Sequence, residues 1–128
     1  MIVGFDFYKT ISAYPETFRG LASSLASEQN EIIIISAVGR TSDKDNYTRH
    51  VREFLETHDI TYKILHIAQF NDDKEIPDLK LEACKTHGVQ VYFDDRSDVC
   101  EKLHKNGIVA MRVGVGNNKK DKHFFKEL

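Results

Sequence analysis

Three short runs of apolar, largely β-branched residues constrain the fold most, because each ends at a polar or acidic residue. The runs are Ile2–Phe5 before Asp6, Ile32–Ile35 before Ser36, and Val91–Phe93 before Asp94 and Asp95. Such runs are typical of strands buried on both faces of a parallel sheet. Since ligands of open α/β sheets bind at the carboxyl ends of the strands, we expect these polar side chains to meet at one edge.

Segments with helical spacing alternate with these runs, which predicts a three-layer α/β sandwich with a mainly parallel, five-stranded sheet. We expect one domain over residues 1–128, with a core of about 1–113 and a basic tail at 114–128. The three apolar runs lie in strands that we expect at 2–6, 31–35 and 89–93. Two further strands are expected at 62–67 and 108–113. Helices are expected after Pro15, after a Ser42 or Asp43 cap, from Pro77 to Gly88, and from a Ser97 cap to Asn106, with a loop at 71–75.

Composition excludes several classes of protein. The net charge of −2 over 128 residues predicts no broad attraction to nucleic acid or anionic membranes. No apolar stretch approaches the roughly 20 residues of a membrane span, and the start lacks the basic segment of a signal peptide. Cys84 and Cys100 have no metal-type spacing, so we expect reduced thiols in a cytoplasmic protein without a membrane partner. Phe124 and Phe125 of the tail are either docked or a contact point, and the oligomeric state stays open.

The residues after the first two strands suit phosphate chemistry. A carboxylate placed like Asp6 can attack phosphorus or bind Mg²⁺, although it is also a common turn cap. The Ser36 hydroxyl and the backbone N–H of Ala37 could hold a phosphate oxygen, or Ser36 could simply end its strand. Arg40 could add a bidentate contact to a substrate phosphate, or remain a solvated loop charge.

The acidic pair Asp94 and Asp95 favours a metal ion. Adjacent carboxylates repel each other unless a cation or hydrogen-bond donors neutralise them. In a strand they point to opposite sides, so we expect one to bind metal and the other to orient the site. The alternative is an acidic helix entry, completed by Asp98. Lys80 could neutralise phosphate and nucleophile together, or be an exposed helix lysine.

The order Asp6, Thr10, Ser36, Lys80, Asp94-Asp95 resembles the four-motif signature of the haloacid dehalogenase (HAD) superfamily. The resemblance covers residues 1 to about 113 and implies a Rossmann-like fold and Mg²⁺-dependent phosphoryl transfer. It implies that Asp6 is nucleophile and metal ligand, that the Tyr8 carbonyl and Asp95 bind metal, and that Asp94 supports them. Thr10 would belong to the catalytic set, and Ser36 and Lys80 would hold phosphate. Residues 36–40, the helical segment 47–55, Lys80 and residues 94–99 are further similar to the 3′-phosphatase domain of phage polynucleotide kinases, although two residues separate Ser36 from Gly39-Arg40.

Tyr8 departs from the phosphatase pattern, in which an aspartate acts as general acid and base. A phenol, with an ordinary pKa of about 10, shuttles protons poorly at neutral pH, and Lys9 replaces the usual glycine. The tyrosine resembles haloacid dehalogenases themselves, but only one helix is expected between Thr10 and Glu31, so no cap domain is predicted. We therefore expect a capless phosphohydrolase acting on an open substrate, such as a nucleic-acid 3′-phosphate, a nucleotide or a phosphoprotein. The alternatives are a non-catalytic domain that binds phosphate, metal or a partner and, less favoured, a dehalogenase-like hydrolase.

Overall fold

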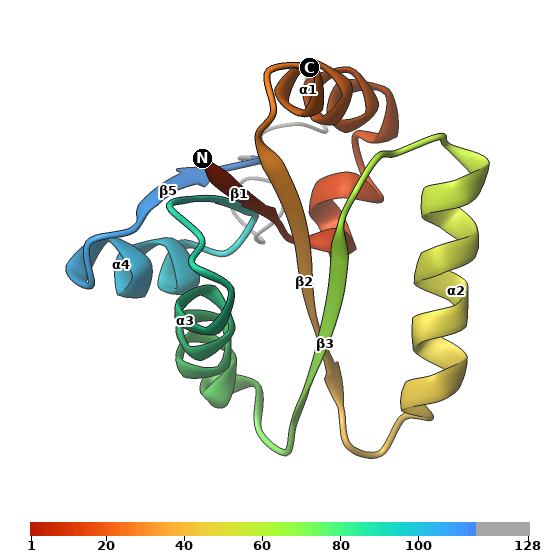
Figure 1. The fold of residues 1–128 in the computed structure, drawn as a ribbon. Coiled ribbons are helices and arrows are strands. Elements are labelled where there is room, and N and C mark those ends of the chain that lie inside the picture. Colours follow the sequence, from red (N-terminus) through yellow and green to blue (C-terminus); the bar gives the residue numbers. More distant parts are fainter. Residues whose placement is uncertain (115–128) are drawn as a thin grey trace, which may run out of the picture.

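A computed structural model describes residues 1–114 and contains one five-stranded, entirely parallel sheet (Figure 1). The strand order is β3-β2-β1-β4-β5, so β1 lies at the centre. The strands are β1 (Ile2–Phe5), β2 (Glu31–Gly39), β3 (Ile64–Phe70), β4 (Val91–Asp94) and β5 (Val109–Arg112). The helices are α1 (Pro15–Ser27), α2 (Lys44–Thr57), α3 (Ile76–His87) and α4 (Ser97–Lys105).

Alternating side chains of the strands bury both faces of the sheet. Ile33 and Ile35 of β2 pack with residues of α3 and α4, whereas Ile32 and Ile34 pack with residues of α1 and α2. This is the two-residue period of a strand that has a helical layer on each side. The predicted Rossmann-like, three-layer sandwich is therefore confirmed. Within residues 1–114, α1 is the only α-helix between β1 and β2, and no cap domain is inserted there.

The second strand is longer than its apolar run predicts. β1 pairs with β2 only as far as Phe5 and Ile34, but β2 continues to Gly39, opposite Phe70 of β3. The prediction that β2 ends at Ile35 was wrong because β3 supplies the hydrogen bonds beyond the end of β1. The two strands run on together past the rest of the sheet (Figure 1). Ser36 thus lies inside β2, yet beyond the last residue of the neighbouring β1.

Local capping chemistry explains the start of α2 and the end of α3. The Asp43 carboxylate accepts a hydrogen bond from Asn46 N at 3.1 Å at the start of α2. Gly88 ends α3 in the left-handed region with a φ of 69°. The predicted Ser97 cap was wrong: Ser97 is the first residue of α4, and Arg96 occupies the cap position without a side-chain bond.

Smaller boundary predictions also differ from the structure. β1 ends at Phe5, β3 begins at Ile64 rather than residue 62, β4 begins at Val91 rather than residue 89, and β5 spans only Val109–Arg112. Helix α3 begins at Ile76, one residue before Pro77. The predicted loop at 71–75 contains a short 3₁₀ turn, Asp73–Glu75, closed by reciprocal bonds between Asp72 and Glu75.

Cys84 and Cys100 are both buried free thiols, as predicted. No described helix is long and apolar enough to cross a membrane. The predictions for residues 115–128, including Phe124 and Phe125, lie outside the described part of the chain.

Candidate active site

Asp6 follows the central strand and lies almost fully buried, with 5% of its surface exposed. Its N–H donates to the carbonyl of Phe93 at 2.8 Å, which continues the pairing between β1 and β4 by one residue. Because the backbone is fixed in this way, the carboxylate projects from the end of the sheet. Its two oxygens have separate partners: Lys80 Nζ lies 2.6 Å from Oδ1, and the Thr10 hydroxyl donates to Oδ2 at 3.0 Å.

Lys80 of α3 is buried, with 2% exposed, and its ammonium group joins three strands. Besides Asp6, Nζ lies 3.0 Å from Asp94 Oδ2 and 2.8 Å from the Tyr92 hydroxyl. It also lies 3.2 Å from the carbonyl of Ile35. The interpretation of Lys80 as an exposed helix lysine is therefore wrong. A buried ammonium requires such partners because leaving its charge unpaired would cost several kcal/mol.

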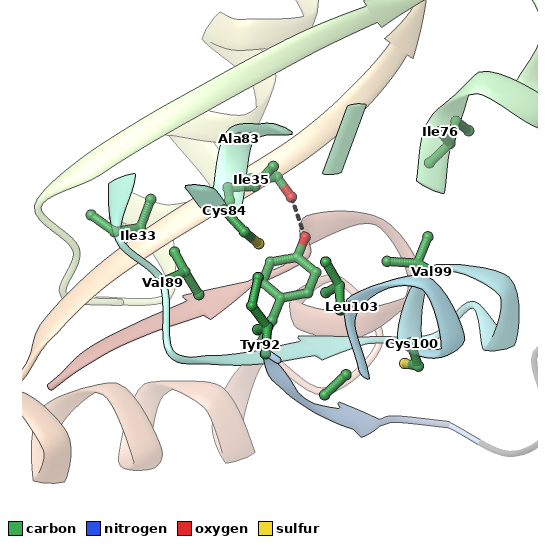
Figure 2. Close-up of a cluster of buried hydrophobic side chains, with 12 residues drawn as sticks. Ile33, Ile35, Ile76, Ala83, Cys84, Val89, Tyr92, Val99, Cys100 and Leu103 are labelled. Atoms are coloured by element: carbon green, nitrogen blue, oxygen red, sulfur yellow. Dashed lines mark hydrogen bonds between the residues drawn. The ribbon is translucent and has the colours of Figure 1, made fainter. Parts of the chain in front are cut away.

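Tyr92 supports Lys80 from within the apolar core (Figure 2). Its ring is fully buried among residues of α3 and α4, and its hydroxyl donates to the Ile35 carbonyl at 2.9 Å while accepting from Lys80. The ring lies against the centre of β1, where a side chain at Gly4 would collide with it. Tyr92 therefore fixes the height of the ammonium group relative to the ends of β1 and β2.

The segment after Asp6 forms a tight turn, Phe7–Ile11, that returns Thr10 to the Asp6 carboxylate. Lys9 has a φ of 61°, and its N–H donates to the Ser12 hydroxyl at 2.8 Å. Tyr8 precedes it in an extended conformation, and 62% of its surface is exposed. The turn thus buries Thr10 and displays the Tyr8 side chain to solvent.

Ser36 has a partly buried partner that its sequence context does not reveal. Its hydroxyl lies 2.6 Å from the hydroxyl of Tyr47, on α2, and either atom could be the donor. Burial raises the pKa of Tyr47, while its bond to Ser36 works in the opposite direction. The Tyr47 phenol therefore stays protonated near neutral pH and can orient the Ser36 hydroxyl toward the site.

Three carboxylates lie close together, and two of them, those of Asp6 and Asp94, pair with the ammonium of Lys80. One oxygen each of Asp6, Asp94 and Asp95 lies within 4.8 Å of the other two. Asp94 is held by Lys80 and by the N–H of Arg96, which donates at 2.9 Å, whereas Asp95 is partly exposed. If all three were ionised, their negative charge would exceed the positive charge of Lys80 by two. Hard oxygen ligands with such a surplus suit Mg²⁺, so the residues fit the predicted metal.

The protonation of the cluster reflects this surplus. Burial raises the pKa of Asp6 to about 8; the charge of Lys80 opposes the rise, and those of Asp94 and Asp95 add to it. Burial also raises the pKa of Asp95, with the charge of Asp94 adding to the rise. For Lys80, burial favours the neutral amine, but Asp6 and Asp94 outweigh it and raise its pKa. One ammonium thus neutralises one carboxylate, and another carboxylate retains a proton when no cation is bound.

A cleft of about 410 Å³ opens above these residues. Its lining includes the predicted residues Asp6, Tyr8, Ser36, Ala37, Lys80, Asp94 and Asp95, together with Lys9, Phe70, Asp73, Ile76 and Arg96. Thr10 lies beneath, bonded to Asp6. Arg40 is not among the lining residues; it lines a separate hollow with His66 and Glu82, beside β3 and α3. The structure therefore brings the predicted site residues together, with the exception of Arg40.

Sequence reasoning missed Tyr92 and Tyr47 as site residues. Tyr92 lies in an apolar strand and Tyr47 on the apolar face of a helix, so each is explained by packing alone. One signal was available in the sequence: a tyrosine whose ring packs in the core needs a hydrogen-bond partner for its hydroxyl. In the predicted fold, the polar residues close enough to be that partner are those of the site.

Comparisons with known proteins concern the fold. No protein-family model matches the chain, and no curated protein matches it either. A chain of the Pnkp1/Rnl/Hen1 complex has a TM-score of 0.70 and 16% identity, over 88% of this chain and 45% of that one. A chain in another structure, of the Pnkp1/Rnl/Hen1 RNA repair complex, has a TM-score of 0.66 and 17% sequence identity, over 88% of this chain and 42% of that one. An uncharacterized protein from Corynebacterium glutamicum has a TM-score of 0.61 and 13% sequence identity, over 98% of this chain and 90% of that one. The chain thus spans less than half of the repair-complex chains, and at these identities the likeness is one of fold.

Proposed function

We propose that the protein is a Mg²⁺-dependent phosphohydrolase of the HAD type that works through an aspartyl-phosphate intermediate. The observation that carries the proposal is the position of Asp6. It is a buried carboxylate at the end of the central strand, bonded to Lys80 and Thr10, with two further carboxylates beside it. A structural salt bridge would need one carboxylate, whereas three carboxylates beside one ammonium leave negative charge for a cation to balance.

Each residue of the site has a part in this mechanism. An Asp6 oxygen attacks phosphorus and forms the acyl phosphate, the bond to the leaving oxygen breaks, and water then hydrolyses the intermediate. Lys80 and the Ser36 hydroxyl hold phosphate oxygens, with the Ala37 N–H beside them. Asp6, Asp95 and the Tyr8 carbonyl would hold Mg²⁺, and Asp94 would orient Lys80. Bound there, Mg²⁺ would supply positive charge that offsets repulsion between the phosphate and the carboxylates.

The substrate we propose is an open, phosphorylated one: a nucleic-acid 3′-phosphate, a nucleotide or a phosphoprotein. No inserted domain covers the cleft within residues 1–114, so a large substrate can approach it. The fold likeness to chains of an RNA repair complex supports a nucleic-acid end within this group. We propose a cytoplasmic location, which the two free thiols of Cys84 and Cys100 support.

One observation favours a second candidate, a domain that binds phosphate, metal or a partner without turnover. Position 8 carries an exposed tyrosine where a phosphatase of this type carries a catalytic aspartate. Loss of general acid–base catalysis costs typically about 10²–10⁴ in rate. The two candidates therefore differ in turnover, and both retain binding.

The deciding experiment measures hydrolysis of p-nitrophenyl phosphate with Mg²⁺ by wild type, Asp6→Asn and Asp45→Asn. Asp45 is an exposed carboxylate on α2, so its substitution controls for charge. We expect turnover by wild type and Asp45→Asn and none by Asp6→Asn, with all three folded by circular dichroism. Equal turnover by Asp6→Asn would refute the aspartyl-phosphate mechanism. No turnover by any of the three, with phosphate still bound, would support the binding domain.

A further inference from the structure

The mouth of the cleft carries an aromatic side chain on a constrained turn. Tyr8 lines the cleft with 62% of its surface exposed, although large aromatic side chains usually bury most of theirs. The turn is fixed from both ends, since Ser12 N–H donates to the Phe7 carbonyl at 3.0 Å and Lys9 N–H donates to the Ser12 hydroxyl. The Lys9 ammonium lies 5.6 Å from the centre of the Tyr8 ring. The ring is therefore presented beside the nucleophile by an ordered backbone.

The remainder of the rim is partly apolar, while the floor is charged. Phe70, Ala37 and Ile76 line the same cleft, at the ends of β3, β2 and the start of α3. Asp6, Lys80 and Asp94 are buried and form the floor. A ligand that complements both parts has a phosphate at one end and a flat, apolar group close to it.

The carboxylates of the cleft also limit which leaving group can depart. Asp6 is the proposed nucleophile, Asp94 is paired with Lys80, and Asp95 is placed with the metal. Asp73, the fourth acidic lining residue, is exposed on the 3₁₀ turn. Tyr8 lines the cleft where the resemblance to HAD phosphatases would put the aspartate that protonates the leaving oxygen. An alkoxide leaves slowly without such a proton, whereas a phenolate is a much weaker base and leaves without it.

We propose that the cleft selects phosphate monoesters of aromatic alcohols, with Tyr8 stacking on the ring of the leaving group. This inference rests on the proposed phosphohydrolase chemistry of Asp6. Among the proposed substrates it favours a phosphoprotein that carries phosphotyrosine, or a small aryl phosphate, over nucleic-acid ends and nucleotides, which are alkyl esters. Asp6 forms the bond to phosphorus as the phosphorus–aryl oxygen bond breaks. The electron pair stays on the aryl oxygen, which leaves as phenolate and takes a proton from solvent. Water then releases inorganic phosphate and restores Asp6.

The test compares phenyl phosphate, a phosphotyrosine peptide, glycerol 2-phosphate and a nucleoside 3′-phosphate with Mg²⁺. We expect wild-type kcat/KM to be about 10²–10⁴-fold higher for phenyl phosphate than for the two alkyl esters, which is the typical contribution of a missing acid. Tyr8→Asp should reduce that ratio about 10²-fold. Tyr8→Leu should raise KM for phenyl phosphate about two- to tenfold, as the loss of one aromatic pair predicts. Tyr14→Leu, an exposed tyrosine outside the cleft, is the matched control. The peptide arm distinguishes the two sources: turnover like that of phenyl phosphate assigns phosphotyrosine, and slower turnover assigns a small molecule.

Equal kcat/KM for aryl and alkyl esters in wild type would overturn the inference while leaving the phosphohydrolase intact. An aryl-to-alkyl ratio of kcat/KM that is unchanged in Tyr8→Leu would also overturn the inference. Loss of alkyl ester hydrolysis in Asp73→Asn would overturn it too, because Asp73 would then be the acid. No turnover of any ester would instead refute the proposed function. Calorimetry would then decide the stacking: phenyl phosphate should bind more tightly than inorganic phosphate in wild type but not in Tyr8→Leu, and equal wild-type affinities would overturn it.

Discussion

Replacing Gly4 by alanine tests whether the site can form only when the centre of β1 carries no side chain at position 4. A Cβ at Gly4 would lie 2.5 Å from Cδ1 of Tyr92, 3.1 Å from its Cε1 and 3.1 Å from Cγ1 of Val89. Carbon atoms in contact ordinarily lie about 3.5–4.0 Å apart, so the overlap is about 1 Å. The Tyr92 ring cannot withdraw freely, because its hydroxyl is bonded to Ile35 and Lys80.

The cost has two parts. Overpacking a core costs typically about 1–3 kcal/mol, and a displaced ring would also weaken a hydrogen bond to a charged group, worth about 1.5–3 kcal/mol. Alanine recovers about 0.5–1 kcal/mol of the entropy that glycine loses in a strand. We therefore expect Gly4→Ala to lower the free energy of unfolding by about 2–4 kcal/mol, measured by urea denaturation followed by circular dichroism.

Gly20→Ala is the matched control for the same chemical change. Gly20 lies in α1, where an added Cβ would meet nothing within 4 Å, so it should gain about 0.5–1 kcal/mol. In a Tyr92→Leu background, the cost of Gly4→Ala should fall below about 1 kcal/mol, because the colliding ring is gone. If both glycine substitutions stabilised the protein, or if Tyr92→Leu gave no relief, the steric argument would be refuted.

Three further predictions concern the charged cluster. Tyr92→Phe should lower the free energy of unfolding by about 1.5–3 kcal/mol, since Lys80 loses a buried acceptor; urea denaturation with Tyr14→Phe as control checks it, and a loss below about 0.5 kcal/mol would contradict it. Asp95→Asn should weaken Mg²⁺ binding at least about tenfold in calorimetry, and unchanged affinity would remove Asp95 from the metal site. Without metal, the stability of wild type relative to Asp6→Asn should fall as pH rises from about 4 to about 8, because burial raises the pKa of Asp6 to about 8, against 3.8 in the unfolded chain, which releases the proton. The comparison removes the opposite contributions of His66 and Asp98, whose pKa values folding lowers; parallel pH profiles of the two proteins in thermal melts would refute it.

The sheet and the chemical character of its edge could be predicted from sequence because both depend on local patterns. The apolar runs before Asp6 and Asp94 each predict a strand and place a carboxylate at its end. Ser36 shows the limit of this reasoning, since its strand continues to Gly39 only because β3 lies alongside. The end of a strand depends on its neighbour as well as on its own residues.

The burial of Lys80 and the place of Arg40 depended on tertiary packing. One charged residue of a helix is indistinguishable from another until the strand beneath it supplies carboxylates. Lys80 lies beside these carboxylates and pairs with Asp6. Arg40 follows the end of β2, and because β2 is longer than predicted, Arg40 lies in a separate hollow outside the site. The roles of Tyr92 and Tyr47 were hidden for the opposite reason, because their rings satisfy the apolar pattern and only their hydroxyls belong to the site.

The central place of β1 has a consequence for the order in which the protein can fold. Asp6 and Lys80 are 74 residues apart in the chain, and synthesis at about 5–20 residues per second separates them by roughly 4–15 s. Through that interval β1 has only β2 to pair with, because β4 does not yet exist. Until α3 and α4 are synthesised, the apolar face of β1 and β2 that these helices cover stays exposed to solvent, which makes the nascent chain prone to aggregation. Non-local parallel pairing then makes this closure slow, and we expect the site to form only once β4 has paired with β1.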